Sequence, residues 1–280
     1  MYVIIWGCRG SIPVSGRQYN KYGGCTSCVE VVLSDGKEIV FDAGTGIRNL
    51  GRRILQEPKV WELTLFLSHP HWDHLMGFPF FQPAYSSRYR IHVRGGPIAK
   101  DSLKQYLQQQ MQAPYFPIRF DALKAEFDFT SGIPVVQRIG RAEVIPIPLS
   151  HPGGGYGFKV VEGDSTFVYL TDNELTYDHE GGKNQYEYVN FAKDADLLLH
   201  DGQYGGKEYQ KRHGWGHSRF LDVIDMAHQA RVKRVGIIHH DPDHDDNDLD
   251  RIGASCTHVA ESYKKTPFSF IAREGQEIEI

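Results

Sequence analysis

The stretch Leu67–Gly77, LSHPHWDHLMG, contains three histidines and one aspartate within six consecutive positions. It directly follows the apolar run that begins at Leu63, a pattern that is typical of a buried strand. The side chains at the end of a strand are free to converge on one point, and here they form the pattern H-x-H-x-D-H: His69, His71, Asp73 and His74. Alternation along the extended part places His69 and His71 on one side, and Asp73 and His74 can turn toward a second point. The pattern therefore predicts a site for two metal ions.

The ligand types indicate which metals would fit. Imidazole and carboxylate ligands suit Zn²⁺, which we expect, and they leave Mn²⁺ and Fe²⁺ as alternatives.

Further candidate ligands stand at the ends of later β-type runs. They are His151 in PLSHPGGG, Asp172 in FVYLTDNE, and either His239 or His240 in VGIIHHDP. Asp42 in IVFDAGTG occupies a similar position. We interpret Asp42 as a carboxylate that orients a ligand, because a metal-bound imidazole usually needs such a partner on its other nitrogen.

Composition excludes several classes of protein. The 280 residues carry 31 basic and 35 acidic side chains, a formal charge of −4, so no overall positive field favours nucleic acid or an anionic membrane. Four cysteines are too few for a disulfide scaffold of this length, and the chain contains neither a long apolar span nor a signal-peptide pattern. These features predict a cytoplasmic protein without a membrane segment.

The order of elements predicts an α/β fold. Strands are expected at residues 3–5, 29–33, 38–41, 61–68, 90–95, 142–150, 156–163, 165–172, 195–201 and 232–240, and helices at 45–55, 99–112 and 218–231. Without a low-complexity linker or a short repeat, residues 1–280 are predicted to form a single domain made of two similar β-then-α halves. Two sheets packed face to face, with helices outside, would fit this order.

These motifs resemble those of the metallo-β-lactamase-fold hydrolases over nearly the whole chain, through the order Asp42, SHPHWDH, His151, Asp172 and a late histidine. The resemblance implies a four-layer αβ/βα sandwich with a dinuclear centre. It implies one ion on His69, His71 and His151, a second ion on Asp73, His74 and the late histidine, and Asp172 bridging both. Similarity of the KRV stretch to the phosphodiesterases of this superfamily favours His239 as the late ligand. His240 stays open as an alternative ligand or substrate contact, because a slip of one residue in a strand exchanges the two faces.

A second pair of motifs narrows the chemistry. LLLHDGQY carries Asp201, and HGWGHSRF carries His217 before an expected helix. They resemble the His-Glu-Ala-Thr and His-Ser-Thr motifs of the phosphodiesterase branch, which includes ribonuclease Z and the phosphonate-pathway cyclic phosphodiesterases. Two positions differ, because Asp201 replaces a glutamate and Arg219 replaces a threonine. An aspartate that accepts from one imidazole nitrogen would hold His217 ready to protonate a leaving alkoxide.

We therefore expect a metal-dependent phosphodiesterase. A hydroxide bridging two divalent ions would attack phosphorus, His217 with Asp201 would protonate the leaving group, and Asp73 is counted with them among the catalytic residues. Only a short segment separates His151 from Asp172, so the long basic arm of the transfer-RNA-processing enzymes has no room. A small phosphodiester such as a cyclic nucleotide is the expected substrate, no large structured RNA is expected, and a homodimer is left open. The alternatives are a ribonuclease acting on RNA 3′ ends and a non-catalytic nucleotide-sensing module.

Overall fold

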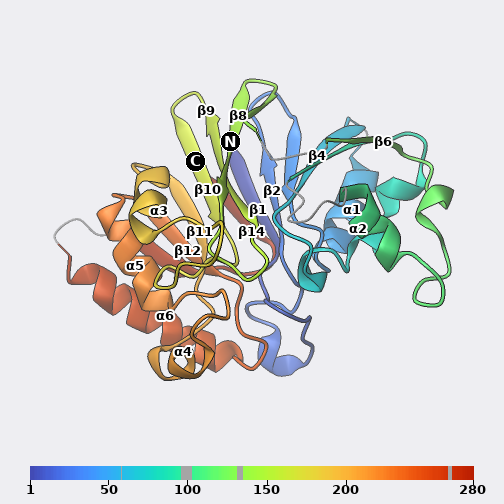
Figure 1. Ribbon diagram of the computed structural model, residues 1–280. Coiled ribbons are helices and arrows are strands. Elements are labelled where there is room, and N and C mark those ends of the chain that lie inside the picture. Colours follow the sequence, from blue (N-terminus) through green and yellow to red (C-terminus); the bar gives the residue numbers. More distant parts are fainter. Residues whose placement is uncertain (58, 96–102, 131–134, 264–266) are drawn as a thin grey trace.

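A computed structural model describes residues 1–57, 59–95, 103–130, 135–263 and 267–280. Two seven-stranded sheets pack face to face, and helices cover the outer face of each (Figure 1). The layers therefore run helix, sheet, sheet, helix, which confirms the predicted αβ/βα sandwich.

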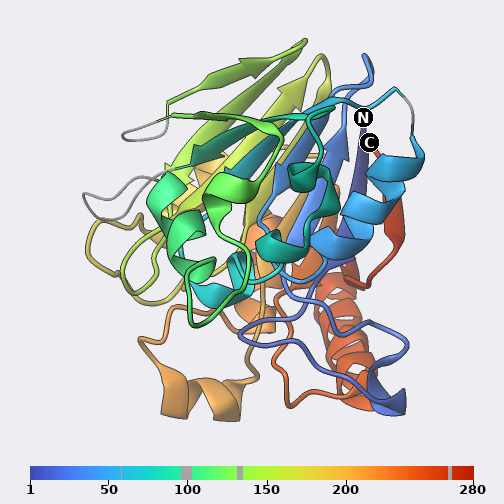
Figure 2. The same ribbon diagram turned by 90° about the vertical axis from the view of Figure 1, so that its right-hand side faces the viewer.

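The first sheet has the order β14-β1-β2-β3-β4-β5-β6. Its strands are β1 (Tyr2–Gly7), β2 (Cys28–Val32), β3 (Glu38–Phe41), β4 (Glu62–Leu67), β5 (Arg90–Gly95), β6 (Glu126–Phe129) and β14 (Gln276–Glu279). Helices α1 (Ile47–Gln56) and α2 (Leu103–Gln110) lie across its outer face (Figure 2). Helix α1 forms there because Ile47, Leu50 and Ile54 recur at helical spacing and are buried against the sheet.

The second sheet has the order β13-β12-β11-β10-β9-β8-β7. Its strands are β7 (Gln137–Ile139), β8 (Ala142–Pro148), β9 (Tyr156–Glu162), β10 (Ser165–Leu170), β11 (Leu197–Asp201), β12 (Arg234–Ile238) and β13 (Phe268–Ile271). The remaining helices are α3 (Gln185–Phe191), α4 (Gly206–Arg212), α5 (Phe220–Gln229) and α6 (Asp246–Glu261). Buried residues of α3, α5 and α6 form the core on the outer side of this sheet.

Aromatic rings join the two sheets at the centre of the sandwich. The ring of Phe41 in β3 lies 5.3 Å from that of Phe158 in β9 and 5.5 Å from that of Tyr169 in β10. Phe66 in β4 contacts Phe158 as well, at 5.0 Å between centroids. Large apolar side chains from both inner faces therefore form one continuous core.

The strands come in parallel runs that determine where the site lies. β3, β4, β5 and β6 are parallel in the first sheet, and β10, β11, β12 and β13 are parallel in the second. The carboxyl ends of neighbouring parallel strands meet at the same edge of a sheet, and loops at that edge can bring side chains from distant parts of the chain together.

The last strand of the chain, β14, does not belong to the second sheet. After β13 the chain returns to the first sheet, where β14 pairs with β1 in an antiparallel register that sets Val3 opposite Ile278. The termini meet there, since the Met1 nitrogen lies 3.3 Å from the Ile280 carbonyl oxygen.

Most predicted elements are present with shifts of a few residues at their ends. The helix predicted at 99–112 corresponds to α2, which begins at Leu103; residues 99–102 lie outside the described part. No bounds were predicted for strands β6, β7, β13 and β14 or for helices α3, α4 and α6. Short segments such as Gln137–Ile139 carry little periodicity of their own. Among the described residues, every helix is too short or too polar to cross a membrane.

Candidate metal centre and active site

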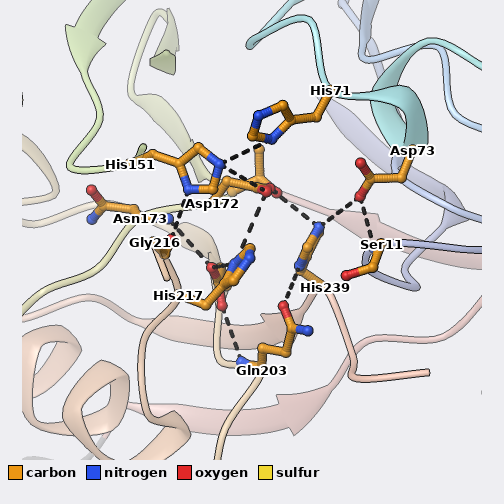
Figure 3. A network of polar contacts seen from close by, with 12 residues as sticks. Ser11, His71, Asp73, His151, Asp172, Asn173, Gln203, Gly216, His217 and His239 are labelled. Atoms are coloured by element: carbon orange, nitrogen blue, oxygen red, sulfur yellow. Dashed lines mark hydrogen bonds and ion pairs between the residues drawn. The ribbon is translucent and has the colours of Figure 1, made fainter. Parts of the chain in front are cut away.

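The predicted ligand residues meet at one edge of the sandwich, each just beyond a strand. The residues of the first motif follow β4, where Trp72–His74 form a 3-10 turn. His151 follows β8, Asp172 follows β10 and His239 follows β12. Figure 3 shows the side chains of His71, Asp73, His151, Asp172 and His239 converging on a common centre.

One group of ligand atoms comes from His69, His71, His151 and Asp172, with all four atoms within 4.8 Å of one another. His71 Nδ1 lies 2.9 Å from His69 Nε2 and 3.1 Å from His151 Nε2. Asp172 Oδ2 lies 3.6 Å from His69 Nε2. Three imidazoles and one carboxylate around a common point form a donor set that suits a divalent cation such as Zn²⁺.

A second group comes from Asp73, His74, Asp172 and His239. His74 Nε2 lies 3.1 Å from Asp172 Oδ1, and His239 Nε2 lies 3.1 Å from Asp73 Oδ2 and 3.3 Å from Asp172 Oδ1. Asp172 belongs to both groups and directs Oδ2 to the first and Oδ1 to the second. This geometry matches two adjacent cation sites that share one carboxylate.

Hydrogen bonds on the opposite ring nitrogens hold these imidazoles in place. His151 Nδ1 lies 3.0 Å from the Gly216 carbonyl oxygen, and His239 Nδ1 lies 3.1 Å from Gln203 Oε1. His69 Nδ1 lies 3.0 Å from Ser68 Oγ. A carbonyl oxygen can only accept, so in His151 and His239 the proton belongs on Nδ1 and the Nε2 lone pair faces the centre.

Asp42 holds the imidazole of His74 in place through a hydrogen bond to its Nδ1. Its Oδ2 accepts from His74 Nδ1 at 2.9 Å, from Ser68 Oγ at 2.9 Å and from the Tyr169 hydroxyl at 3.0 Å, and its Oδ1 accepts from the Ser68 amide at 2.8 Å. The carboxylate is fully buried. It lies where the sequence interpretation expected it, behind a candidate ligand.

The His74 nitrogen tests whether a metal fits. Its Nε2 is buried and makes no hydrogen bond of acceptable geometry to any described residue, although it lies 3.3 Å from Asp73 Oδ2. With Nδ1 bonded to Asp42, Nε2 faces two carboxylates; burial disfavours charge on the ring, but Asp73 and Asp172 outweigh it and raise the pKa of His74 well above its usual value. A cation between them would satisfy all these atoms at once, so the residues fit a divalent metal.

The electrostatics of the two groups support the same conclusion. Burial lowers the pKa of His69 well below its usual value and that of His151 to about 4, which leaves both rings neutral and able to coordinate. Burial also disfavours charge on His239, but Asp172 and Asp73 outweigh it and raise the His239 pKa to about 9. The paired carboxylates therefore attract positive charge to the second group.

A histidine–aspartate pair stands next to the two groups. His217 Nδ1 lies 2.7 Å from Asp201 Oδ2 and 4.0 Å from Asp172 Oδ2. The ring of His217 stacks on that of His239, with centroids 4.9 Å apart. The Asp201 carboxylate accepts hydrogen bonds from the backbone amides of Asn173 and Gln203, at 3.3 and 3.0 Å. The structure thus brings Asp201 and His217 together, as the sequence motifs predicted.

Two residues discussed in the sequence analysis, His240 and Arg219, belong to neither ligand group among the described residues. His240 directs Nε2 to the Ala272 carbonyl oxygen at 2.8 Å. Arg219, the departure from the family motif, forms two 2.6 Å contacts with Asp222 at the start of α5. Its guanidinium is therefore engaged with the helix.

Glu174 is a buried residue that the sequence reasoning missed. One of its oxygens accepts from the Gly214 amide at 2.8 Å and the other from the Gly216 amide at 2.7 Å. Gly216 in turn accepts from His151 and precedes His217. Glu174 therefore anchors the loop that supplies both residues, and its position two residues after Asp172 was the only signal in the sequence.

Gly216 shows how closely this loop approaches the centre. Its φ is +94°, and a Cβ there would lie 2.1 Å from His151 Nδ1. Only glycine fits this conformation and spacing without moving the imidazole.

A cavity of about 460 Å³ opens onto both groups and onto His217. It is bordered by Ser11, Pro70, His71, Trp72, Asp73, Asp172, His217 and His239. Its volume lies in the range of about 300 to 1,000 Å³ that is typical of small-ligand sites.

Comparison with known proteins agrees with this geometry. The family model described as "Beta-lactamase superfamily domain" matches residues 37–240. The chain is 23% identical to a ribonuclease Z of Haloarcula marismortui, over 85% of this chain and 86% of the relative. The crystal structure of YhfI from Bacillus subtilis, a metallo-beta-lactamase fold protein, superposes with a TM-score of 0.71 at 16% identity, covering 100% of this chain and 99% of that one. A diphosphatase from the PhnP family gives 0.68 at 15% identity, with 100% and 97% covered.

These similarities confirm the predicted likeness to the phosphodiesterase branch, and they agree with the prediction of a hydrolase, because ribonuclease Z and the diphosphatase are hydrolases by name. With a family model that covers most of the sandwich and histidine and aspartate groups that fit metal, the chain belongs to the beta-lactamase superfamily.

Proposed function

We propose that this protein is a metal-dependent phosphodiesterase that hydrolyses a small phosphodiester such as a cyclic nucleotide. The observation that carries the proposal is the position of His217, which is bonded to the buried Asp201 and borders the same cavity as the two ligand groups. Acyl hydrolysis of a lactam or thioester has less need of a separate acid for an alkoxide leaving group.

The two ligand groups would hold two divalent cations, with Zn²⁺ favoured over Mn²⁺ and Fe²⁺. Cations bound there supply Lewis acidity for the phosphoryl oxygens and for the attacking water. His69, His71, His74, His151, His239, Asp73 and Asp172 are the proposed ligands.

Protonation of the leaving group is the role that we propose for His217. With Nδ1 bonded to Asp201, the ring can deliver a proton from Nε2 into the cavity. The Asp201 carboxylate accepts from the backbone amides of Asn173 and Gln203 as well, which fixes its position behind the imidazole. Stacking of His217 on His239 and the contact of its ring with Tyr204 restrict the ring to one orientation.

A small substrate is supported by the lining of the cavity. Among the described residues that border it, none is lysine or arginine. Affinity for a long nucleic acid rests mainly on basic contacts to many phosphates. A ligand with a single phosphodiester needs no such contacts outside the metal centre.

Cleavage of RNA near its 3′ end is the second candidate function. It is favoured by the curated relatives, several of which are named ribonuclease Z. Tight RNA binding that weakens steeply with added salt would support it, since each released counterion contributes to that slope.

A panel of substrates tests the proposal. The purified protein, with its metal content measured, would be assayed on 2′,3′- and 3′,5′-cyclic nucleotides, bis-p-nitrophenyl phosphate, a short RNA, a thioester and a β-lactam. Turnover of a cyclic nucleotide with about two ions per chain is the expected result. Preferred turnover of the thioester or the lactam would overturn the proposal.

Replacing His217 with alanine tests the acid. Turnover of a cyclic nucleotide should fall by roughly a hundredfold or more, whereas the nitrophenyl ester, whose leaving group needs no proton, should be affected far less. His213→Ala is the matched control, because His213 lies in the same loop and is exposed. Equal losses on both substrates, or none, would remove the acid role.

A further inference from the structure

Trp72 is exposed in an unusual setting. Its side chain retains 80% of its accessible surface, although both neighbours belong to the candidate metal centre. His71 and Asp73 point into the centre, and the 3-10 turn that begins at Trp72 directs the indole outward to the rim of the cavity. None of the described residues hydrogen-bonds to the Trp72 indole nitrogen, so the fold gives this ring no internal partner.

The cavity has two chemically different parts. Asp73, Asp172 and His217 provide its polar part, next to the ligand groups, and Trp72 and Pro70 form an apolar rim. A ligand that fits both parts carries a phosphodiester at one end and a flat apolar group at the other. Exposed tryptophan offers a π face on which a nucleobase can stack.

From this arrangement we propose that Trp72 is a specificity-determining residue that stacks the base of a nucleotide substrate while the phosphodiester lies at the metal centre. The proposal rests on the proposed phosphodiesterase function and narrows its substrate class to diesters with a nucleobase attached through one ribose.

The contribution of one stacked base to binding affinity is large enough to measure. Loss of a stacking aromatic residue typically weakens binding by roughly ten- to a hundredfold per base. The effect is nearly independent of which base is present, because every base has a π face. Trp72 would therefore select for a base without selecting strongly among bases.

Two matched diesters isolate this effect. The first is adenosine 2′,3′-cyclic phosphate, and the second is 1-O-methylribose 2′,3′-cyclic phosphate, which has the same strained ring and no base. The ratio of their kcat/KM values should fall by about tenfold or more in Trp72→Leu. Trp61→Leu is the control, because Trp61 is also exposed, at 55%, and precedes β4, whereas Trp72 follows that strand.

A binding measurement separates this proposal from the proposed function. Adenosine 5′-monophosphate should quench the tryptophan fluorescence of the wild type and of Trp61→Leu, and ribose 5-phosphate should not. Trp72→Leu should lose the quenching while its circular dichroism and metal content stay unchanged. If quenching depends on Trp72 but no diester is hydrolysed, the stacking site stands and the phosphodiesterase function fails.

Two outcomes would overturn the stacking role. One is hydrolysis of both diesters with a ratio that Trp72→Leu leaves unchanged. The other is a ratio that falls only in Trp215→Leu, because Trp215, 60% exposed and two residues before His217, would then be the residue that stacks the base.

Discussion

The metal centre and a second cluster both bury ionisable side chains, but they compensate the cost of burial in different ways. In the second cluster, on the outer side of the first sheet, Arg53 of α1 contacts Glu38 at 2.6 Å and also pairs with Glu30, and Trp6 donates to Glu30 at 2.9 Å. In the metal centre, ligand atoms face a cavity, and His74 Nε2 has no hydrogen-bonding partner among the described residues.

The difference distinguishes a structural cluster from a functional one. Unlike charges that pair with each other support the fold, because each compensates the desolvation of the other. Imidazole nitrogens and carboxylates that converge on a cavity instead form a site for a cation that is not part of the polypeptide. Substitutions in the metal centre should therefore change turnover and metal content, and substitutions in the Arg53 cluster should change stability.

The largest effect is expected for Asp172→Asn. Asparagine tolerates the φ of +49° at this position, so the backbone should be retained. Because Asp172 serves both ligand groups, kcat/KM should fall on the order of a thousandfold, which corresponds to about 4 kcal/mol. Mass spectrometry of the bound metal should show fewer ions per chain. Asp178→Asn, on the exposed loop nearby, should change neither quantity; full activity of Asp172→Asn would contradict the shared-carboxylate assignment.

The Arg53 cluster should respond in the opposite way. Arg53→Met leaves two buried carboxylates without their cation and should lower the free energy of unfolding by about 2 to 3 kcal/mol, less than for a fully buried pair because Arg53 is 31% exposed. Urea unfolding measures this loss. Turnover of the remaining folded protein should be unchanged. Arg52→Met is the control, because Arg52 faces solvent one residue away; a loss of turnover comparable to that of Asp172→Asn would erase the distinction between the clusters.

Glu174→Gln tests the support of the metal centre. An amide group in place of one carboxylate oxygen would face the Gly214 or Gly216 amide, donor against donor, and displace the loop that carries His217. We expect kcat to fall roughly thirtyfold, equivalent to about 2 kcal/mol, with the metal content nearly retained. The loss should be greater for cyclic nucleotides than for a nitrophenyl ester. Glu180→Gln, on the exposed surface, serves as the control; an equal loss on both esters would indicate a general structural role.

The smallest effect concerns pH. Burial, together with the charge of Glu38, raises the pKa of Glu30 to about 7, against the opposing effect of Arg53. The folded protein thus holds this proton more tightly than the unfolded chain, so its stabilising contribution is complete below the unfolded pKa of about 4.5 and is lost as pH rises through 7. Between pH 5 and pH 7, wild type should lose about 1 to 2 kcal/mol relative to Glu30→Gln. Urea unfolding of both proteins at several pH values measures the difference, and parallel curves would contradict the raised pKa of Glu30.

The part of the metal centre next to β4 was predictable because its geometry is local. Strand alternation and the following turn decide how His69, His71, Asp73 and His74 diverge, and both follow from the order of residues. The fold class was predictable for a similar reason, since apolar periodicity marks most of the central strands. The individual roles of these residues stay predictions.

The rest of the site depends on contacts between distant residues. His151, Asp172, Asp201, His217 and His239 come from separate parts of the chain. The parallel register of β10, β11 and β12 brings Asp172, Asp201 and His239 to one edge, and the antiparallel pairing of β8 with β9 and of β9 with β10 brings His151 to the same edge. The sequence pattern gave almost no indication of Glu174 and Gln203. Their role as buried hydrogen-bond acceptors depends on the amides and imidazoles that pack around them in the fold.

The sequence by itself indicated the superfamily, through the resemblance of its motifs, and it indicated the layered architecture and the ligand-type side chains at the strand ends, because apolar periodicity and the order of residues are local. Only the tertiary structure places His239, and not His240, within a candidate ligand group among the described residues. Adjacent residues at the end of a strand point in different directions, and here His239 faces Asp73 while His240 faces the Ala272 carbonyl. It also decided that Trp72 borders the cavity and that β14 returns to the first sheet, since both depend on where segments far apart in the chain pack.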